Sequence, residues 1–452
     1  MNLEATVTRM RLANPADAVD PDEMAALQAA IDDAMAAPSG RRRRVPLRWR
    51  PRPAMAVGLA LVLTLALFLP LRYFGQSNGT SDEAVATPPS STALPTTTPP
   101  TSVAPRTPAL PLGVDPTELR WRRVEMPGLS GGYQWFDSLV AGGPGLIAVG
   151  SPRGEFEACA WTSEDGVEWL PATIGVAPNS AWAFDVTAGG PGYVAVGSGI
   201  WASSDGEQWT NANVADPIIG ELRAVTVGGP GLVAVGTLHL NRASIYTSSD
   251  GLTWSPIPED GAPAAAYESE ITDIVAGGPG LIAVGHSGLT AAVWTSSDGF
   301  EWTRVPHDPD VFGKDSEETE LLGIAADAAG FVAVGGISDN AMGVWRSTDG
   351  VNWSVVPLDP EVMNGSHSLT TIVSTEQGFI VGGDGGGGDA GAWFSPDGFS
   401  WTRLETGDAL GGPGYQVMSD ITVFDDRLVA VGWEIDGNDD SEVVWIAEPA
   451  EE

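Results

Sequence analysis

The sequence of 452 residues predicts an all-β fold, a seven-bladed β-propeller with four-stranded antiparallel blades, closed by an N-terminal strand. One transmembrane helix and a Pro/Thr-rich linker are predicted to precede it. Two repeated motifs carry the prediction: Ser-x-Asp-Gly-x-x-Trp occurs six times, and a short apolar run ending in Gly occurs seven times. Both recur every ~40 to 50 residues, a period that is typical of propellers.

Residues 1–53 are predicted to form a cytoplasmic segment with one short helix. Asp20 can cap this helix, Pro21 suits its first position, and Glu23 completes a capping box, so the helix covers residues 20–37. Its narrow apolar stripe could dock a cytoplasmic partner or lie on the membrane surface. A disordered segment with a transient helix is the alternative.

Residues 54–71 form the predicted transmembrane helix. They carry no charge and, as a helix, span about 27 Å at about 1.5 Å per residue. Seven Arg lie within residues 41–52 and only Arg72 follows closely, so the positive-inside rule places the N-terminus in the cytoplasm and residues 73–452 outside it. A cleaved signal peptide, cut after Ala86, is the competing interpretation. An uncleaved anchor is favoured because that site lies far beyond the apolar run.

Residues 72–114 are rich in Thr, Pro and Ser and hold too few apolar side chains to fold. They are predicted to be a spacer between the membrane and the propeller, which is assigned to residues 115–452.

The Ser-x-Asp-Gly-x-x-Trp motif marks a hairpin tip in each of six repeats. Gly tolerates positive φ, and an Asp carboxylate accepts hydrogen bonds from turn amides, so Asp-Gly between two β-rich runs indicates a tight hairpin. An aromatic residue stands two positions before each Ser. The motif aspartates, which are assigned a structural role, are Asp165, Asp205, Asp250, Asp298, Asp349 and Asp397.

Upstream of each motif, a β-rich run, a turn and the apolar run ending in Gly predict two further strands. One repeat is therefore strand a, strand b, strand c, the Asp-Gly tip and strand d, which together form a four-stranded blade. The seventh repeat ends after a strand c at Glu442–Ala447. Leu119–Pro127 resembles the Trp-containing d strands, so its pairing with Glu442–Ala447 is predicted to close the ring and remove an unpaired sheet edge.

The motif resembles the Asp-box, or BNR repeat, of the sialidase-like propellers, a superfamily of sialidases, other glycosidases and noncatalytic assembly factors. The resemblance covers residues 115–447. This sequence lacks the one residue that the family usually has between Asp and Gly, which implies a tighter turn and a divergent branch. In that family the boxes are structural and lie away from the ligand face, so the resemblance implies that these carboxylates are not catalytic.

Sialidase chemistry, which the resemblance raises, uses an arginine triad, a Tyr nucleophile activated by Glu, and an Asp acid. The family's Arg-Ile-Pro segment has no match here, because Arg123–Pro127 reads Arg-Val-Glu-Met-Pro. The arginines predicted to flank the box tips, on the wrong face, are Arg304, Arg346 and Arg403. Those that could face the ligand side are Arg153, Arg223 and Arg242.

The charge of the chain excludes one class of partner. Residues 111–452 hold 11 Lys and Arg against 50 Asp and Glu. Such a field repels phosphate backbones, so no nucleic-acid partner is predicted. No metal site or cofactor is predicted either, because the four His are scattered. Asp436, Asn438, Asp440 and Glu442 alternate like a calcium loop but lack its glycine and distal glutamate, which favours a solvated loop.

The ligand site of a propeller is expected over its central channel, in the loops that join strand d to a and strand b to c. Besides the three arginines, the ligand-face candidates there are Trp135, Trp182, Glu221, Tyr267, Tyr415 and Trp433. The same loops also hold Phe312, His367, Asp308, Asp310, Glu317, Glu318 and Glu320.

Three functions remain open. The first is an extracytoplasmic, noncatalytic binding or scaffold module, held in the membrane by residues 54–71, with an envelope protein, a peptide or a glycan as its ligand. The second is a divergent glycoside hydrolase of the sialidase type, which would show two carboxyl groups beside convergent arginines. The third is a membrane-bound regulator acting through residues 20–37.

Overall fold

The structure of the chain is a computed structural model. It describes residues 110–124, 133–143, 145–153, 159–174, 182–215, 218, 220–238, 242–258, 269–278, 280–314, 316, 318–337, 341–363, 368–404, 406–412, 414–436 and 439–449. The predicted cytoplasmic segment, membrane helix and most of the linker lie outside these residues. Among the residues that are described, no helix has the length and apolar character needed to cross a membrane.

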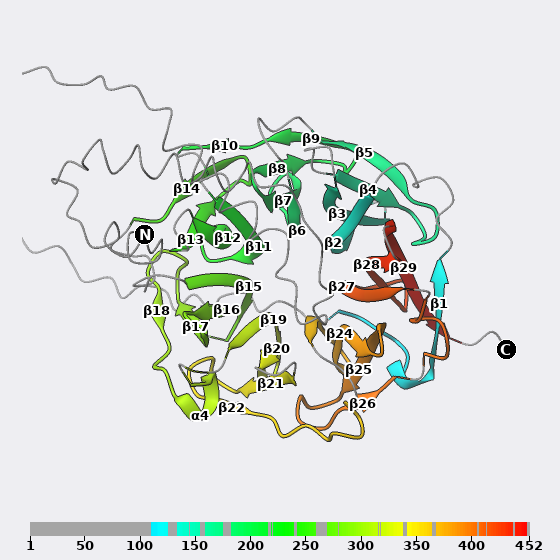
Figure 1. Cartoon of the computed structure of the whole chain (residues 1–452). Helices are drawn as coiled ribbons and strands as arrows, with labels where there is room; N and C mark the ends of the chain where they lie inside the picture. The colour runs from blue at the N-terminus through cyan, green and yellow to red at the C-terminus, as the bar shows by residue number, and fades with distance from the viewer. Residues whose placement is uncertain are drawn as a thin grey trace, which may run out of the picture. The chain divides into compact units, whose positions relative to one another are not determined.

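Seven four-stranded antiparallel blades are arranged in a ring (Figure 1), which confirms the predicted seven-bladed propeller. Blade 1 contains β2 (Tyr133–Gly142), β3 (Gly145–Arg153), β4 (Cys159–Ser163) and β5 (Leu170–Ile174). Blade 2 contains β6 (Ala183–Gly189), β7 (Gly192–Gly197), β8 (Ile200–Ser203) and β9 (Gln208–Asn211). The last strands of blades 1 and 2, β5 and β9, also pair in parallel, which joins these two blades into one eight-stranded sheet. Blade 3 contains β11 (Gly220–Gly228), β12 (Gly231–Leu238), β13 (Arg242–Ser248) and β14 (Thr253–Pro256).

Blade 4 contains β15 (Ser269–Gly277), β16 (Gly280–Ser287), β17 (Thr290–Ser296) and β18 (Thr303–Arg304). Blade 5 contains β19 (Thr319–Asp327), β20 (Gly330–Ile337), β21 (Ala341–Ser347) and β22 (Trp353–Val355). Blade 6 contains β23 (Leu369–Thr375), β24 (Gly378–Gly386), β25 (Asp389–Ser395) and β26 (Thr402–Arg403). Blade 7 contains β27 (Tyr415–Phe424), β28 (Arg427–Asp436), β29 (Asp439–Pro449) and β1 (Leu119–Val124).

Three short elements lie outside this pattern. The strand β10 (Asn213–Val214) pairs in parallel with β14, and the 3-10 helix η1 (Pro116–Glu118) precedes β1. The helix α4 (Pro309–Phe312) lies in the connection from blade 4 to blade 5.

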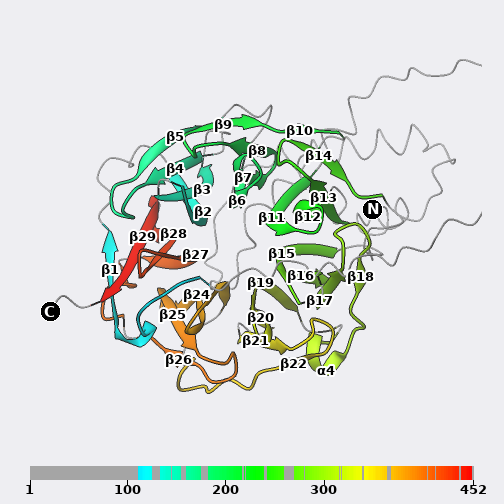
Figure 2. The ribbon, with the colours of Figure 1, turned by 180° about the vertical axis from the view of Figure 1, so that it is seen from behind.

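The first strand of each blade lies around the channel, and neighbouring blades pack face to face around it (Figure 2). Seven clusters of buried apolar side chains fill the seven seams between blades in the described part of the chain. The aromatic residue of each strand c is at most 2% exposed and lies in one of these clusters: Trp161, Trp201, Tyr246, Trp294, Trp345, Trp393 and Trp445. The repeated aromatics are therefore core residues.

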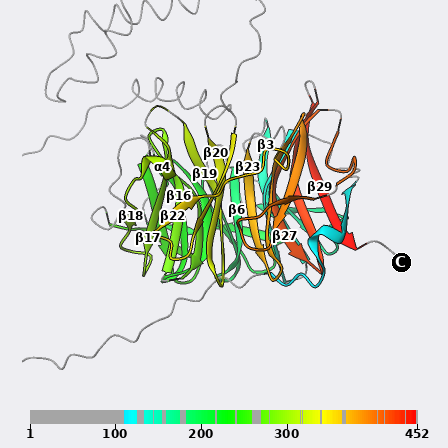
Figure 3. The same cartoon turned by 90° about the horizontal axis from the view of Figure 1, so that it is seen from below.

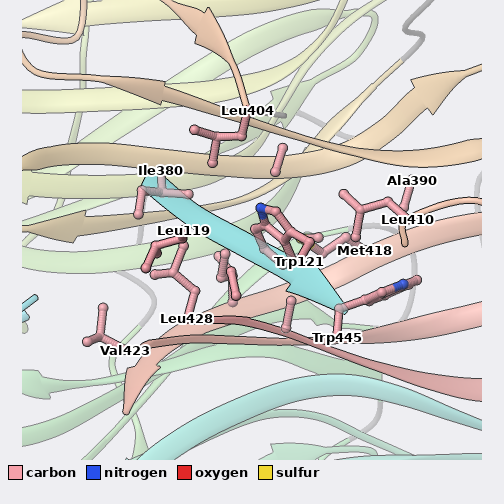
Figure 4. Packing of buried hydrophobic residues seen from close by; sticks show 14 of the residues in the cluster. Leu119, Trp121, Ile380, Ala390, Leu404, Leu410, Met418, Val423, Leu428 and Trp445 are labelled. Carbon is pink, nitrogen blue, oxygen red and sulfur yellow. The ribbon is translucent and has the colours of Figure 1, made fainter. Parts of the chain in front are cut away.

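The ring closes through the predicted N-terminal strand. β1 pairs antiparallel with β29, from Leu119 opposite Pro449 to Val124 opposite Val444. Trp121 of β1 and Trp445 of β29 lie in the same apolar cluster between blades 6 and 7 (Figure 4). Because one blade is built from both ends of the propeller sequence, opening the ring requires breaking a complete strand pairing.

Strands run between two faces of the ring (Figure 3). The box face carries the turns between strands a and b and the Asp-boxes. The opposite face, here called the mouth face, carries the connections from d to a and from b to c.

Each Asp-box is a local hydrogen-bond unit. In the first box the Ser163 hydroxyl accepts from Gly166 N at 2.8 Å, and Asp165 Oδ1 accepts from Val167 N and Glu168 N at 2.8 and 2.9 Å. The Trp169 indole donates to Gly166 O at 3.0 Å. Gly166 has a φ of 77°, which a residue with a Cβ rarely adopts. The same Ser and Asp bonds recur in the other five boxes.

Residues 110–113, which the sequence assigns to the linker, pack on the box face; we call them the strap. Leu110 N donates to Ser374 O at 2.9 Å, and Glu376 N donates to Leu110 O at 3.1 Å. Leu112 is fully buried in the cluster between blades 6 and 7. The strap is also held by Gln377 Nε2, which donates to Leu112 O, and by Asp426 Oδ1, which accepts from Gly113 N.

Candidate functional site

A bulge near the mouth face shapes the start of every strand a. The pairing register of strands a and b shifts there in all seven blades, for example between Phe136 and Ser138 in blade 1. Opposite the bulge stands the Gly that ends each apolar run. A Cβ on Gly150 would collide with the carbonyl oxygen of Trp135, and the equivalent glycines meet the equivalent carbonyls. Because this Gly has no Cβ, the bulge can form opposite it. The bulge in turn places the residue that precedes it in strand a, such as Trp135, at the mouth face.

That presented position differs from blade to blade. It is occupied on blades 1 to 7 by Trp135, Trp182, Glu221, Glu270, Glu320, Ser368 and Val417. Phe184, Arg223 and Trp433 contact some of these side chains, and Tyr415 lies against Trp433. We define the mouth as Trp135, Trp182, Phe184, Glu221, Arg223, Glu270, Glu320, Tyr415 and Trp433.

Aromatic side chains occupy the mouth on blades 7, 1 and 2. Trp135 stacks on Trp433, with ring centroids 5.4 Å apart and planes inclined by 27°. Tyr415 lies against Trp433 with centroids 5.8 Å apart, and its hydroxyl donates to Asp384 at 2.7 Å. Tyr415 is 40% exposed. These three rings, from two neighbouring blades, form a platform that solvent reaches in part.

Carboxylates occupy the mouth on blades 3, 4 and 5. The Arg223 guanidinium contacts Glu221 at 2.7 Å and Glu270 at 2.9 Å. It also lies 4.5 Å from the centroid of the Phe184 ring. Burial raises the pKa of Glu221, which Arg223 lowers in part and Glu270 raises further. One guanidinium thus links three blades and neutralises one of two carboxylates.

Below the mouth, three aspartates join neighbouring blades along the channel wall. Asp185 accepts from Val186 N of its own strand and from Val225 N of blade 3, at 2.8 and 2.7 Å. Asp273 does the same between blades 4 and 5, with Ile324 N at 2.8 Å.

Asp420 joins blade 7 to blade 1 through Leu139 N at 2.8 Å, and it also accepts from Ile421 N. The Ser138 hydroxyl contacts both Asp185 and Asp420, at 2.7 and 3.1 Å. The channel aspartates therefore link the inner strands of neighbouring blades by hydrogen bonds.

Burial governs the titration of these channel aspartates. Loss of water raises the pKa of Asp185 to about 7 and that of Asp273 to about 8, although backbone hydrogen bonds oppose the rise. The pKa of Asp420 is raised for the same reason. The carboxylates also repel one another. The hydrogen bonds from backbone amides account for the presence of these carboxyl groups. In the described residues, no group of three or more His, Cys, Asp or Glu side chains is arranged to hold a metal ion.

The structure brings most of the ligand-face candidates to the mouth. Trp135, Tyr415 and Trp433 meet on one side, and Glu221 and Arg223 on the other, while Trp182 lies against Phe184 with centroids 6.0 Å apart. No contact with this group is described for the other three candidates. Arg242 is exposed at the start of β13, Arg153 ends β3 with a side chain outside the described part, and Tyr267 lies outside it altogether.

Two residues of the connection from blade 4 to blade 5 contribute to packing and capping, and the direction expected for two arginines was wrong. Phe312 is 3% exposed and lies in the cluster between blades 4 and 5, because α4 folds back onto the blades. Asp308 caps that helix. The guanidinium groups of Arg304 and Arg403 reach Ser287 and Gly385, toward the mouth face, because both side chains run away from the boxes.

Glu442 was predicted both to begin strand c and to carry a solvated charge. It lies in β29, as the strand prediction requires, but it is only 8% exposed, because its strand continues into the seam. Glu318 is exposed, and His367 and Glu317 lie outside the described residues.

Sequence reasoning missed the channel aspartates and Glu270. A signal existed for the aspartates: each stands twelve residues before the Gly that ends the apolar run of its blade. The pairs are Asp185 and Gly197, Asp273 and Gly285, and Asp420 and Gly432. Glu270 carried no such mark, because its role depends on Arg223 of the neighbouring blade.

No family model and no curated protein matches the sequence. Solved structures are similar in fold, at low identity. U3-55K is 11% identical with a TM-score of 0.45, over 73% of this chain and 98% of that one. Saccharomyces cerevisiae Sqt1 is 10% identical with a TM-score of 0.44, over 72% and 87%. A gluconolactonase-like protein is 12% identical with a TM-score of 0.39, over 76% and 97%. The fold assignment rests on the strand pairing of this chain, and membership of the sialidase-like superfamily stays a prediction.

Proposed function

We propose that this chain is a membrane-anchored, extracytoplasmic and noncatalytic binding module that holds a protein or peptide partner at the mouth. One observation carries the proposal. The strand-c aromatic, the strand-b Gly and the Asp-box recur from blade to blade, whereas the presented mouth position changes from Trp to Glu to Ser and Val. Since blade folding needs no particular side chain there, a ligand explains the concentration of large aromatic and charged residues.

The chemistry of the mouth supports a protein or peptide rather than a phosphorylated polymer. Trp and Tyr are enriched where proteins bind one another, because their rings give a large contact area at a low cost in side-chain entropy. The carboxylates on the other half of the mouth repel anions. The combination of an aromatic half and an acidic half favours an extended segment laid across both.

The proposed location rests on sequence outside the described residues. Residues 54–71 supply the anchor and the arginines of residues 41–52 supply the orientation. A cytoplasmic partner of residues 20–37 belongs to the same proposal. Protease digestion of intact cells, followed by detection of tags at each terminus, tests the topology: the C-terminal tag should be cleaved and the N-terminal tag protected.

Crosslinking in the membrane tests the mouth. Full-length protein with a photoreactive amino acid in place of Trp182 should crosslink a defined envelope protein, and the Trp135→Ala/Trp433→Ala variant should lose that product. The matched control is Leu252→Ala/Phe399→Ala, which removes two exposed apolar side chains from the box face. Equal crosslinking by all three proteins would overturn the proposal.

A glycoside hydrolase is the second candidate, and one observation favours it. Glu221 and Glu270 flank the same guanidinium, and burial raises the pKa of Glu221, as a general acid requires. Against it, both carboxylates contact Arg223. Hydrolysis of a fluorogenic sialoside by the wild type, and its loss in Glu221→Gln, would replace the binding module with an enzyme.

A further inference from the structure

The residue that follows the Gly of an Asp-box is an exposed apolar side chain on four neighbouring blades. Blades 3 to 6 carry at this position Leu252, Phe300, Val351 and Phe399, each between 45% and 52% exposed. We call these four residues the apolar row. They belong to the Asp-boxes, so they lie on the box face, opposite the mouth. Val227, near the end of strand a in blade 3, adds a fifth exposed apolar side chain to this face.

The Asp-box itself does not require these side chains. Its Asp accepts a hydrogen bond from the backbone amide of this residue, as Asp298 does from Phe300 N at 2.8 Å. The box of blade 2 makes the same bond at 2.9 Å with Glu207, whose side chain is exposed and charged. Single exposed apolar side chains are common on protein surfaces, whereas a concentration of them on one face marks a contact surface.

The arrangement of the apolar row fits a flat surface. Because the four boxes are equivalent turns of blades arranged around one channel (Figure 3), their tips lie at about the same level of the ring. A bilayer reaches side chains that share a plane even when they belong to separate blades, whereas a protein partner needs a continuous apolar patch. The row is therefore better suited to a lipid surface than to a protein.

The charges around the apolar row favour neutral lipids. On blades 3, 5 and 6 the next residue of the box is uncharged: Thr253, Asn352 and Ser400. The boxes of blades 1 and 2 instead expose Glu168 and Glu207. Hydrogen bonds from turn amides lower the pKa values of the box aspartates, so these carboxyl groups stay ionised and repel anionic head groups. Zwitterionic lipids avoid that repulsion.

The strap joins the propeller to the predicted anchor on the same face. Leu110 is bonded beside the a–b turn of blade 6, and Gly113 to the a–b turn of blade 7. The connection to the predicted membrane helix, residues 72–109, spans at most about 120 Å when extended at about 3.1 Å per residue. Such a tether confines the propeller near the bilayer, and this raises the effective concentration at which weak apolar contacts form.

We propose that the apolar row docks on the surface of the membrane that holds the anchor, with its side chains among the head groups of neutral lipids. The proposal rests on the anchor of the proposed function. Phe and Leu side chains bury favourably at the boundary between head groups and acyl chains. With the box face on the bilayer, the mouth opens away from it, and the partner approaches from the side opposite the membrane.

Photocrosslinking to lipid tests the docking. Full-length protein is reconstituted in phosphatidylcholine vesicles with a photoreactive amino acid in place of Val351 or, as the matched control, of Leu289. Leu289 is 49% exposed in the turn from β16 to β17, on the mouth face of blade 4. Mass spectrometry after irradiation should show at least fivefold more lipid adduct at position 351 than at position 289, in low salt and in high salt.

Two double variants separate docking from binding at the mouth. Leu252→Ala/Phe399→Ala should lower the lipid adduct at position 351 at least threefold and keep the partner crosslink at position 182, because the anchor still holds the propeller near the membrane. Trp135→Ala/Trp433→Ala should lose the partner crosslink and keep the lipid adduct. Thermal unfolding checks that both variants are folded.

The outcomes distinguish the docking from the proposed function. Equal lipid adducts at positions 351 and 289, an adduct that Leu252→Ala/Phe399→Ala leaves unchanged, or a crosslink at position 351 to a second copy of the chain in place of lipid, overturns the docking. If the partner crosslink at position 182 still depends on Trp135 and Trp433, the binding function stands without it. Extraction of the full-length protein from the vesicles by alkaline carbonate would show that the anchor is absent, and the proposed location and the docking then fail together.

Discussion

The box aspartates and the channel aspartates make nearly the same hydrogen bonds, but their pKa values shift in opposite directions. Asp298 accepts from Phe300 N and Glu301 N, and Asp273 accepts from Ile274 N and Ile324 N, all at 2.7 to 3.0 Å. The pKa of Asp298 is lowered by these bonds, whereas burial raises that of Asp273 to about 8. Access to water, rather than the number of amide donors, decides the sign.

The difference also separates two structural tasks. An exposed box carboxylate bonds amides of its own turn and fixes a local hairpin. A channel carboxylate bonds amides of two blades and fixes their relative position. Substitutions in the two regions should therefore differ in the size of their effect and in its pH dependence.

Removal of a channel carboxylate should have the largest effect. Asp420→Ala deprives the amides of Leu139 and Ile421 of their acceptor. Since each buried donor without a partner costs about 1–3 kcal/mol, we expect the free energy of unfolding to fall by about 2–6 kcal/mol in urea titrations followed by tryptophan fluorescence. Asp420→Asn keeps one acceptor oxygen and should lose less. Wild-type stability of both variants would show that the hydrogen bonds of Asp420 are dispensable.

The pH dependence should come next in size. Asp185 and Asp273 have folded pKa values of about 7 and 8, above their ordinary value of 3.8. Their contribution to stability is complete below pH 3.8 and is lost as the pH rises toward these values, by up to about 1.4 kcal/mol per pH unit for each carboxyl. Urea titrations from pH 5 to pH 9, in steps of about one unit, measure this decline. Asp273→Asn should reduce the slope; a flat wild-type profile would contradict the burial argument.

Removal of the carboxylate of one Asp-box should have a smaller effect on stability. Asp298→Ala removes the acceptor of two turn amides that water can still reach, so we expect a loss of about 1 kcal/mol, as for a helix N-cap. Thermal unfolding measures it. Because the pKa of Asp298 is lowered, its contribution is lost as the pH falls below its ordinary range. The variant should consequently differ least from wild type in acid.

The smallest effect concerns a third kind of aspartate, in the turn of blade 7. Asp425 and Asp426 have φ values of 50° and 58°, where glycine is preferred. Asp425→Gly should stabilise the chain by about 0.5–1 kcal/mol. Asp426→Gly relieves the same strain but loses the bond to Gly113 N of the strap, so it should gain less. Hydrogen exchange at residues 110–113 should rise only in Asp426→Gly; equal exchange would mean that Asp426 does not hold the strap.

The sequence predicted the architecture because the fold is repeated locally. Each Ser-x-Asp-Gly-x-x-Trp motif makes its own turn, and each apolar run ending in Gly makes its own strand and bulge, so six or seven copies reinforce one interpretation. Even the closure of the ring was visible in the sequence, since the predicted segment Leu119–Pro127 contains β1 (Leu119–Val124), which completes a blade that lacks its last strand.

Only the tertiary structure decided the contacts between blades. Asp273 bonds Ile324, and Arg223 bonds Glu270, across about fifty positions, and no motif records such a pair. The alternating acidic residues that end at Glu442 predicted solvated charges, yet Glu442, which begins the predicted strand c, is 8% exposed and lies opposite Trp433. Sequence periodicity determines which side of a strand a residue occupies, but burial and partners depend on the neighbouring blade, and this is why the framework was predictable and the mouth was not.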